Sequence, residues 1–242
     1  GINFIPRMFR FDVEKEKDQD MTAQFKARQL RLEVRGDITD RIFYRFRHRL
    51  NKSNAATSLD NLAKATDMLY AGFRLDDKWT LTAGKMCQAW GGFEFDLNPM
   101  NIYEYSDFID NMDNFMLGAM ITYAPNPNHE FNLQITDVRN SNFADLYATA
   151  TATIKESNTP LAYIFNWNGN LLDGLVQMRW GAGLQSEADG YTNTLVMLGT
   201  KLNLPKFQMF LDYMMANDQL DRLNYTPLSN NGSATPVKDA KY

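Results

Sequence analysis

The sequence predicts an all-β protein, more specifically a transmembrane antiparallel up-and-down β-barrel. Three observations lead to this prediction. Apolar and polar side chains alternate in about eleven runs, aromatic residues gather near the ends of the runs, and short turns alternate with longer polar loops. The runs span about ten residues, whereas strands of soluble proteins typically have five or six.

The expected strands follow one another along the whole chain. Turn residues such as Asp76 and Asp77, or the segment 125–128, separate some of them, and the polar stretches 51–65, 89–112 and 140–160 separate others. The strands are expected at residues 2–11, 24–36, 41–50, 66–75, 78–87, 113–124, 129–139, 161–168, 175–185, 191–202 and 207–216.

The tail has a different character. Residues 225–242 show no strand periodicity. We therefore expect a single barrel domain over residues 1–242 that is incomplete on its C-terminal side.

The composition is that of a folded chain, and it limits the classes of function. The 242 residues carry a net charge of −4, with 44% apolar and 13% aromatic residues. The acidic balance argues against a nucleic-acid partner. Cys87 is the one cysteine, and His48 and His129 are the two histidines. The sequence therefore offers almost no residues for a disulfide, a His-based zinc site or a Ser-His-Asp triad. We expect neither an enzyme nor a cofactor or metal site.

No run approaches eighteen consecutive apolar residues, so the sequence predicts no transmembrane helix. Barrel strands give a weaker signal, because only alternate residues face the lipid. The opening segment 1–7 lacks the basic start and apolar run of a secretory signal. We therefore expect that the numbering begins inside a processed or trimmed chain.

The most informative run is the segment 41–50, which is rich in arginine. Arg45, Arg47 and Arg49 share one parity, while the apolar residues share the other. Because successive side chains of a strand point to opposite faces, this pattern predicts one apolar wall and one wall of guanidinium groups. Guanidinium groups attract phosphate and carboxylate oxygens.

Two interpretations of the alternation stay open at this point. A soluble β-sandwich also alternates apolar and polar residues, and parity alone does not separate it from a barrel. If the barrel is correct, one set of apolar residues faces lipid: Ile42, Tyr44, Phe46, Leu117, Ile121, Leu133, Val176, Met178, Leu198 and Leu211.

A series of motifs between Arg28 and about Tyr123 resembles the phosphate-selective porin O and P family of Gram-negative outer membranes. The motifs are RLEVRGDI leading into RIFYRF, then ATDMLYAGF, WTLTAGK, WGGFE and IYEYSD. The resemblance implies a bacterial outer-membrane barrel of about sixteen strands, commonly trimeric, that passes anions or small polar solutes. It also implies contact with membrane lipid and lipopolysaccharide.

With this resemblance, we interpret the cationic residues of one parity as an anion-attracting pore wall. A solvated polar face is the alternative interpretation. The candidate residues are Arg31, Arg35, Arg45, Arg47, Arg49, Arg74, Lys85 and Arg179.

The long loop 88–113 combines acidic and aromatic residues. Loops of this length are uncommon and usually have a function. The aromatic residues of this loop would let it pack inside the barrel and form a constriction. An ordinary extracellular loop is the alternative. The candidate constriction residues are Glu94, Asp96, Glu104 and Asp107. The sequence thus favours an anion-passing porin, with a structural barrel subunit of a larger outer-membrane complex and a soluble sandwich-type binding module as alternatives.

Overall fold

The computed structural model describes residues 1–14, 22–55, 59–97, 102, 105–110, 112–147, 154–220 and 240–241. The eleven expected strands are all present, and a further strand of two residues follows them. The strands are β1 (Ile2–Glu14), β2 (Thr22–Asp37), β3 (Ile42–Arg49), β4 (Thr66–Arg74), β5 (Trp79–Cys87), β6 (Phe115–Asn126), β7 (His129–Asp137), β8 (Leu161–Leu171), β9 (Val176–Ala188), β10 (Tyr191–Leu204), β11 (Phe207–Asp218) and β12 (Ala240–Lys241).

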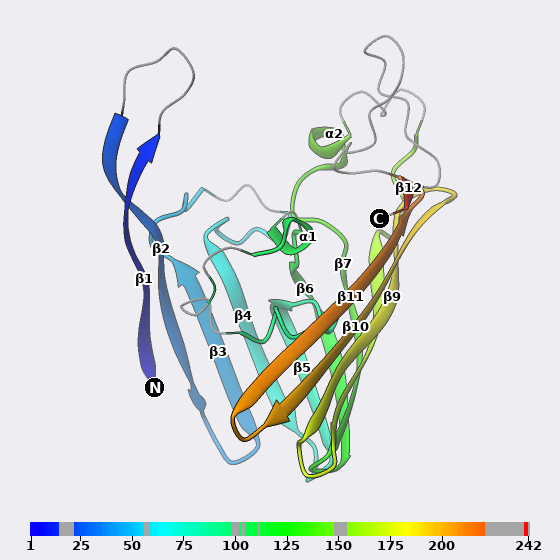
Figure 1. Ribbon diagram of the computed structural model, residues 1–242. Helices are drawn as coiled ribbons and strands as arrows, with labels where there is room; N and C mark the ends of the chain where they lie inside the picture. Colours follow the sequence, from blue (N-terminus) through cyan, green and yellow to red (C-terminus); the bar gives the residue numbers. More distant parts are fainter. Residues whose placement is uncertain are drawn as a thin grey trace.

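All the strands belong to one antiparallel sheet. Each strand pairs with the next one along the chain, in the order β1 to β12. The sheet curls around a hollow, and among the described residues its two edges do not meet (Figure 1). The all-β, up-and-down architecture predicted from the sequence is confirmed, and the sheet is that of a partial barrel. The described strands do not form the two packed sheets of a sandwich.

The two ends of the curled sheet differ in their connections. Short turns join the strands at the lower end in Figure 1, for example between β6 and β7 and between β10 and β11. Longer segments join them at the upper end, and these contain the helices α1 (Asp107–Asp110) and α2 (Phe143–Leu146). Of the expected unstructured tail, residues 225–239 and 242 lie outside the described part of the chain, and β12 pairs with the end of β11.

The convex face of the sheet is apolar. Leu117, Ile121, Leu133 and Leu211 are 39%, 36%, 54% and 70% exposed on it. Near the short turns, aromatic rings pack along this face: Trp79 stacks on Tyr123 with ring centroids 4.4 Å apart, and further rings follow on β7 to β9. Such a surface is unfavourable in water but favourable in lipid.

Within the described segments, no helix is long and apolar enough to span a bilayer.

One of the two apolar core clusters of the described residues lies inside the curl of the sheet. It is centred on Trp90, whose side chain is fully buried against Ile164, Leu195 and Met197 from β8 and β10. Because Trp90 belongs to the connection between β5 and β6, this core joins a loop to the inner face of the sheet.

Candidate functional site: a charged cavity inside the sheet

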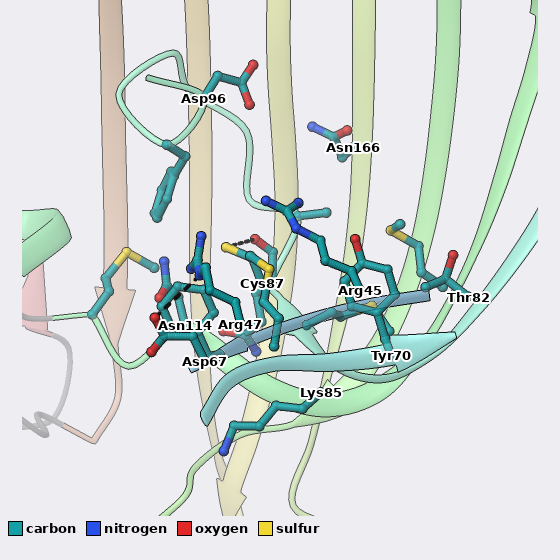
Figure 2. Close-up of a pocket in the computed structure, with 18 of the residues that line it drawn as sticks. Arg45, Arg47, Asp67, Tyr70, Thr82, Lys85, Cys87, Asp96, Asn114 and Asn166 are labelled. Carbon is teal, nitrogen blue, oxygen red and sulfur yellow. Dashed lines mark hydrogen bonds and ion pairs between the residues drawn. The ribbon is translucent and has the colours of Figure 1, made fainter. Parts of the chain in front are cut away.

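The concave side of the sheet encloses a cavity of about 1240 Å³ (Figure 2). Inward-facing residues of β2 to β9 line it, together with the segment between β5 and β6. Its side chains are mostly polar or charged, in contrast to the apolar convex face. The alternation of each strand produces this difference, because neighbouring residues point to opposite faces.

The densest charge lies on β2 and β3. The antiparallel register places Arg31 opposite Arg49 and Arg35 opposite Arg45, with Glu33 opposite Arg47 between them. All six residues line the cavity. Like charges directly opposite one another destabilise a sheet, so this wall requires compensating carboxylates.

One such carboxylate is Asp67, which is 3% exposed and lies where the register between β3 and β4 shifts. Nε of Arg49 donates to it at 2.9 Å, and Nε of Arg31 and of Arg47 each lie 3.4 Å from its Oδ2. Those last two nitrogens make no hydrogen bond with the described residues. A single acid therefore compensates three arginines only in part.

Glu33 is the second carboxylate of this wall. It accepts hydrogen bonds from Nη2 of Arg45 at 2.8 Å and from Nε at 3.2 Å, and Arg35 lies 3.7 Å away. The guanidinium of Arg47 also lies over the ring of Phe115, 5.0 Å from its centroid. These contacts hold the arginine side chains in fixed positions along the wall. Figure 2 shows Arg45 and Arg47 beside Asp67 and Tyr70.

The other cationic residues expected in the pore wall lie in three different places. Arg179 lines the cavity from β9 and pairs with Asp96 at 2.8 Å. Lys85 contacts the cavity lining, but its ammonium lies 2.5 Å from Asp60, and Figure 2 shows it pointing away from Arg45 and Arg47. Arg74 is not among the lining residues; it pairs with Asp37 at 2.7 Å near the short turns.

The segment between β5 and β6 runs through the interior of the sheet and docks on β9 to β11. N–H groups of its backbone donate to the carbonyl of Arg179 and to the carboxylate of Asp212: Gly92 to the former, Phe93 and Glu94 to the latter, each at 2.9 Å. At its start, Ala89 donates to Gln134 on β7 at 2.7 Å. The segment thereby forms one side of the cavity.

Glycines on β9 and β10 allow this close approach. A Cβ atom at Gly181 would lie 2.0 Å from the carbonyl oxygen of Trp90, and one at Gly199 would lie 2.9 Å from Cα of Gly92. Any larger residue at these two positions would force the segment off the sheet. Around Trp90, the segment also makes a buried, almost wholly apolar contact with the inner face of the sheet.

The expected constriction acids take different roles within this segment. Glu94 accepts hydrogen bonds from the backbone N–H and the hydroxyl of Ser106, at 2.6 and 2.9 Å, and so closes the loop on itself. Asp96 lines the cavity beside Arg179. Asp107 is exposed at the start of α1. Glu104 lies outside the described residues.

The lining as a whole is positive. Nine cationic and six acidic residues line the cavity, including Lys52 and Lys64 from the segment after β3. Partial desolvation, and then the neighbouring Arg49, lower the pKa of Lys52. No cluster of His, Cys, Asp or Glu suited to a metal ion is present among the described residues.

Several of these site residues were not found from the sequence. Asp67 is displaced from the regular alternation by the register shift, so parity gave no signal for it. Asp212 carried a weak signal, as a single acid between Phe210 and Met214 on the inward parity of β11. Its partners are about 119 residues away in the sequence, which no local pattern reveals.

A single curled sheet with an apolar outer face and a charged inner cavity is the structure of a membrane β-barrel. The phosphate-selective porin O and P family model matches residues 6–240, nearly the whole chain, and the protein belongs to this family. A comparison with curated protein sequences gives no match.

Proposed function

We propose that this protein is a passive pore of a bacterial outer membrane that prefers small anions. The family to which it belongs supports the membrane and the class of protein. The apolar convex face and the polar cavity support a route for solutes along the inside of the sheet.

The observation that carries the proposal is the contrast between the charge of the chain and the charge of the cavity. The chain has a net charge of −4, whereas cationic residues outnumber acidic ones by nine to six in the lining. Low-dielectric walls and confined water strengthen the effect of each charge inside a channel. The cavity should therefore attract anions although the protein as a whole is acidic.

Within this pore, the residues assigned to anion attraction are Arg31, Arg35, Arg45, Arg47, Arg49 and Arg179, all in the lining. Arg74 and Lys85 contribute less, because each is paired with an acid away from the centre of the cavity. The segment between β5 and β6 narrows the route, with Asp96 facing the cavity and Glu94 stabilising the loop.

Recording from planar bilayers tests this proposal. With the purified protein between two KCl solutions of different concentration, the reversal potential should have the sign of an anion-preferring channel. The preference should weaken as salt rises, because screening shortens from about 10 Å at 0.1 M to about 3 Å at 1 M. A cation-preferring channel, or no conductance, would refute the proposal; no conductance would favour a structural role in a larger complex.

A further inference from the structure

Across the cavity from the arginine residues of β2 and β3, a row of amide and hydroxyl groups lines strands β6 to β8. The register places Thr122 opposite Asn132, and Asn132 opposite Asn166. The hydroxyl of Thr122 donates to Oδ1 of Asn132 at 2.6 Å, and Nδ2 of Asn132 donates to Oδ1 of Asn166 at 2.9 Å. The three side chains form one hydrogen-bonded row, and all of them line the cavity.

Glu130 fixes the orientation of this row from one side. Its Oε1 accepts from Nδ2 of Asn132 at 3.0 Å and from Nδ2 of Asn168 at 2.9 Å. Asn166 in turn donates to the carbonyl of Trp180 at 3.1 Å. Because each amide is held by a defined partner, the row is preorganised. Asn132 and Asn166 are only 4% and 3% exposed, so Thr122 and Asn168, which are half-buried, offer most of the groups that a solute can reach.

This row has a chemistry different from that of the arginine residues of β2 and β3. The described lining residues of β6 to β8 include no lysine or arginine, and they include the carboxylate of Glu130. Arg179 on β9 lies next to the row, opposite Asn168, but it is paired with Asp96. A simple anion therefore gains little from the row itself and is repelled by Glu130. A hydroxyl group both donates and accepts, so it matches amides and a carboxylate equally well.

From these two opposed surfaces we propose that the cavity binds small polyols that carry one anionic group, of the sugar-acid class. The anionic group lies against the arginines and the hydroxyl groups lie against the row of Thr122, Asn132, Asn166 and Asn168. This inference rests on the proposed anion-preferring pore and specifies its solute.

The placement of the labelled residues agrees with this assignment. Figure 2 shows Arg45 extending into the cavity from the wall that also carries Tyr70, with Asn166 projecting from the wall behind. The cavity, at about 1240 Å³, exceeds the roughly 300–1,000 Å³ that is typical of ligand pockets. A six-carbon acid and several waters fit in it together.

A zwitterion is the competing solute, because an ammonium group could pair with Glu130. The same oxygen of Glu130 already accepts from Asn132 and Asn168, and the cationic Arg179 on β9 lies opposite Asn168, where it would repel an ammonium group. Several neutral groups in a row fit several hydroxyls better than they fit one cation.

Block of the chloride current in single-channel recording distinguishes these solutes. The probes are gluconate, butyrate, 4-aminobutyrate and neutral sorbitol. Gluconate should block at a concentration roughly fivefold lower than butyrate, about what one net hydrogen bond provides, although butyrate is the smaller anion. Sorbitol should block weakly, since it lacks the anionic group. Equal block by gluconate and butyrate, or stronger block by 4-aminobutyrate, would overturn the inference.

Variants locate the effect in the row. Asn168→Ala and Asn166→Ala should each reduce the advantage of gluconate over butyrate and leave butyrate block unchanged. Asn170→Ala is the matched control, since Asn170 lies on β8 with the same parity but outside the cavity lining. Loss of the advantage in the control as well, or in neither lining variant, would contradict the assignment.

Different results would refute the anion-preferring pore and the sugar-acid assignment. A wild-type channel that prefers cations would refute the anion-preferring pore itself. A channel that prefers anions but blocks equally with gluconate and butyrate would refute only the sugar-acid assignment.

Discussion

The two sides of the cavity use the inward parity of their strands in opposite ways. On β9 to β11 the inward positions carry glycines such as Gly181 and Gly199, and a loop fills the space above them. On β2 and β3 the inward positions carry arginines, and the space above them stays open as the cavity. Residue size on the inner face therefore decides where the interior is packed, and residue charge decides what the remaining space attracts.

The contrast between the two sides of the cavity requires that the inward face of each strand is assigned correctly. Leu117→Arg tests this assignment and should have the largest effect on stability. Leu117 is 39% exposed on the convex face of β6. An arginine there should destabilise the inserted protein by about 2–4 kcal/mol if the position lies near the middle of the bilayer. Met120→Arg is the control, because Met120 lies on the same strand but lines the cavity. Urea unfolding in lipid vesicles measures the free energy of unfolding of both variants. An equal loss of stability in the two would contradict the assignment of the faces.

The second test replaces a glycine of the packed side. Gly181→Val would place a Cβ atom 2.0 Å from the Trp90 carbonyl oxygen, so the loop must move. We expect a loss of about 1–3 kcal/mol, as in other overpacked sites, together with a larger conductance. Ala182→Val, the next residue on the convex face, should have neither effect. An unchanged conductance in Gly181→Val would show that the docked loop does not narrow the pore.

Asp212→Ala tests the anchor of the same loop with a smaller change. Loss of this carboxylate leaves the N–H groups of Phe93 and Glu94 without their acceptor, at a cost of about 1–3 kcal/mol. We expect greater current noise in single-channel records as the loop detaches. Asp212→Asn keeps one acceptor oxygen and should be intermediate. Records identical to those of the wild type would contradict the anchoring role.

Asp67→Asn tests the charged side and should have the smallest effect on conductance. It removes the acid that three arginines share, while the amide oxygen still offers an acceptor to Arg49. The reversal potential should move further in the anion-preferring direction. Asp37→Asn, at the pair with Arg74 outside the cavity lining, is the control. A shift toward cation preference would contradict the account.

The charged side was largely predictable from the sequence, and the packed side was not. Alternation places Arg45, Arg47 and Arg49 on one face whatever the neighbouring strands are, so a local pattern was sufficient. The docking of the loop depends on contacts between Gly92 and Arg179, and between Phe93 and Asp212. These pairs are distant in the sequence, and only the order and register of the strands bring them together.

Local irregularities of the strands account for the remaining differences. Parity predicted that Lys85 belongs with the arginines, but its ammonium lies against Asp60. The backbone at Gly84 has a φ of +128°, and after it the alternation on β5 ends, since Lys85 and Met86 are both buried, although the pairing with β4 and β6 stays in register. Asp67 reaches the arginines through a similar irregularity between β3 and β4. Irregularities of this kind depend on the pairing of whole strands, so periodicity within one strand does not reveal them.

The most direct test of the central claim is the reversal potential of the double variant Arg45→Ala/Arg47→Ala beside that of Arg74→Ala, in the same KCl gradient. Arg45 and Arg47 line the cavity, whereas Arg74 does not. The account predicts that the double variant moves the potential toward zero and that Arg74→Ala leaves it unchanged. Equal shifts in both, or no shift in the double variant, would show that the arginine residues of the cavity do not determine selectivity.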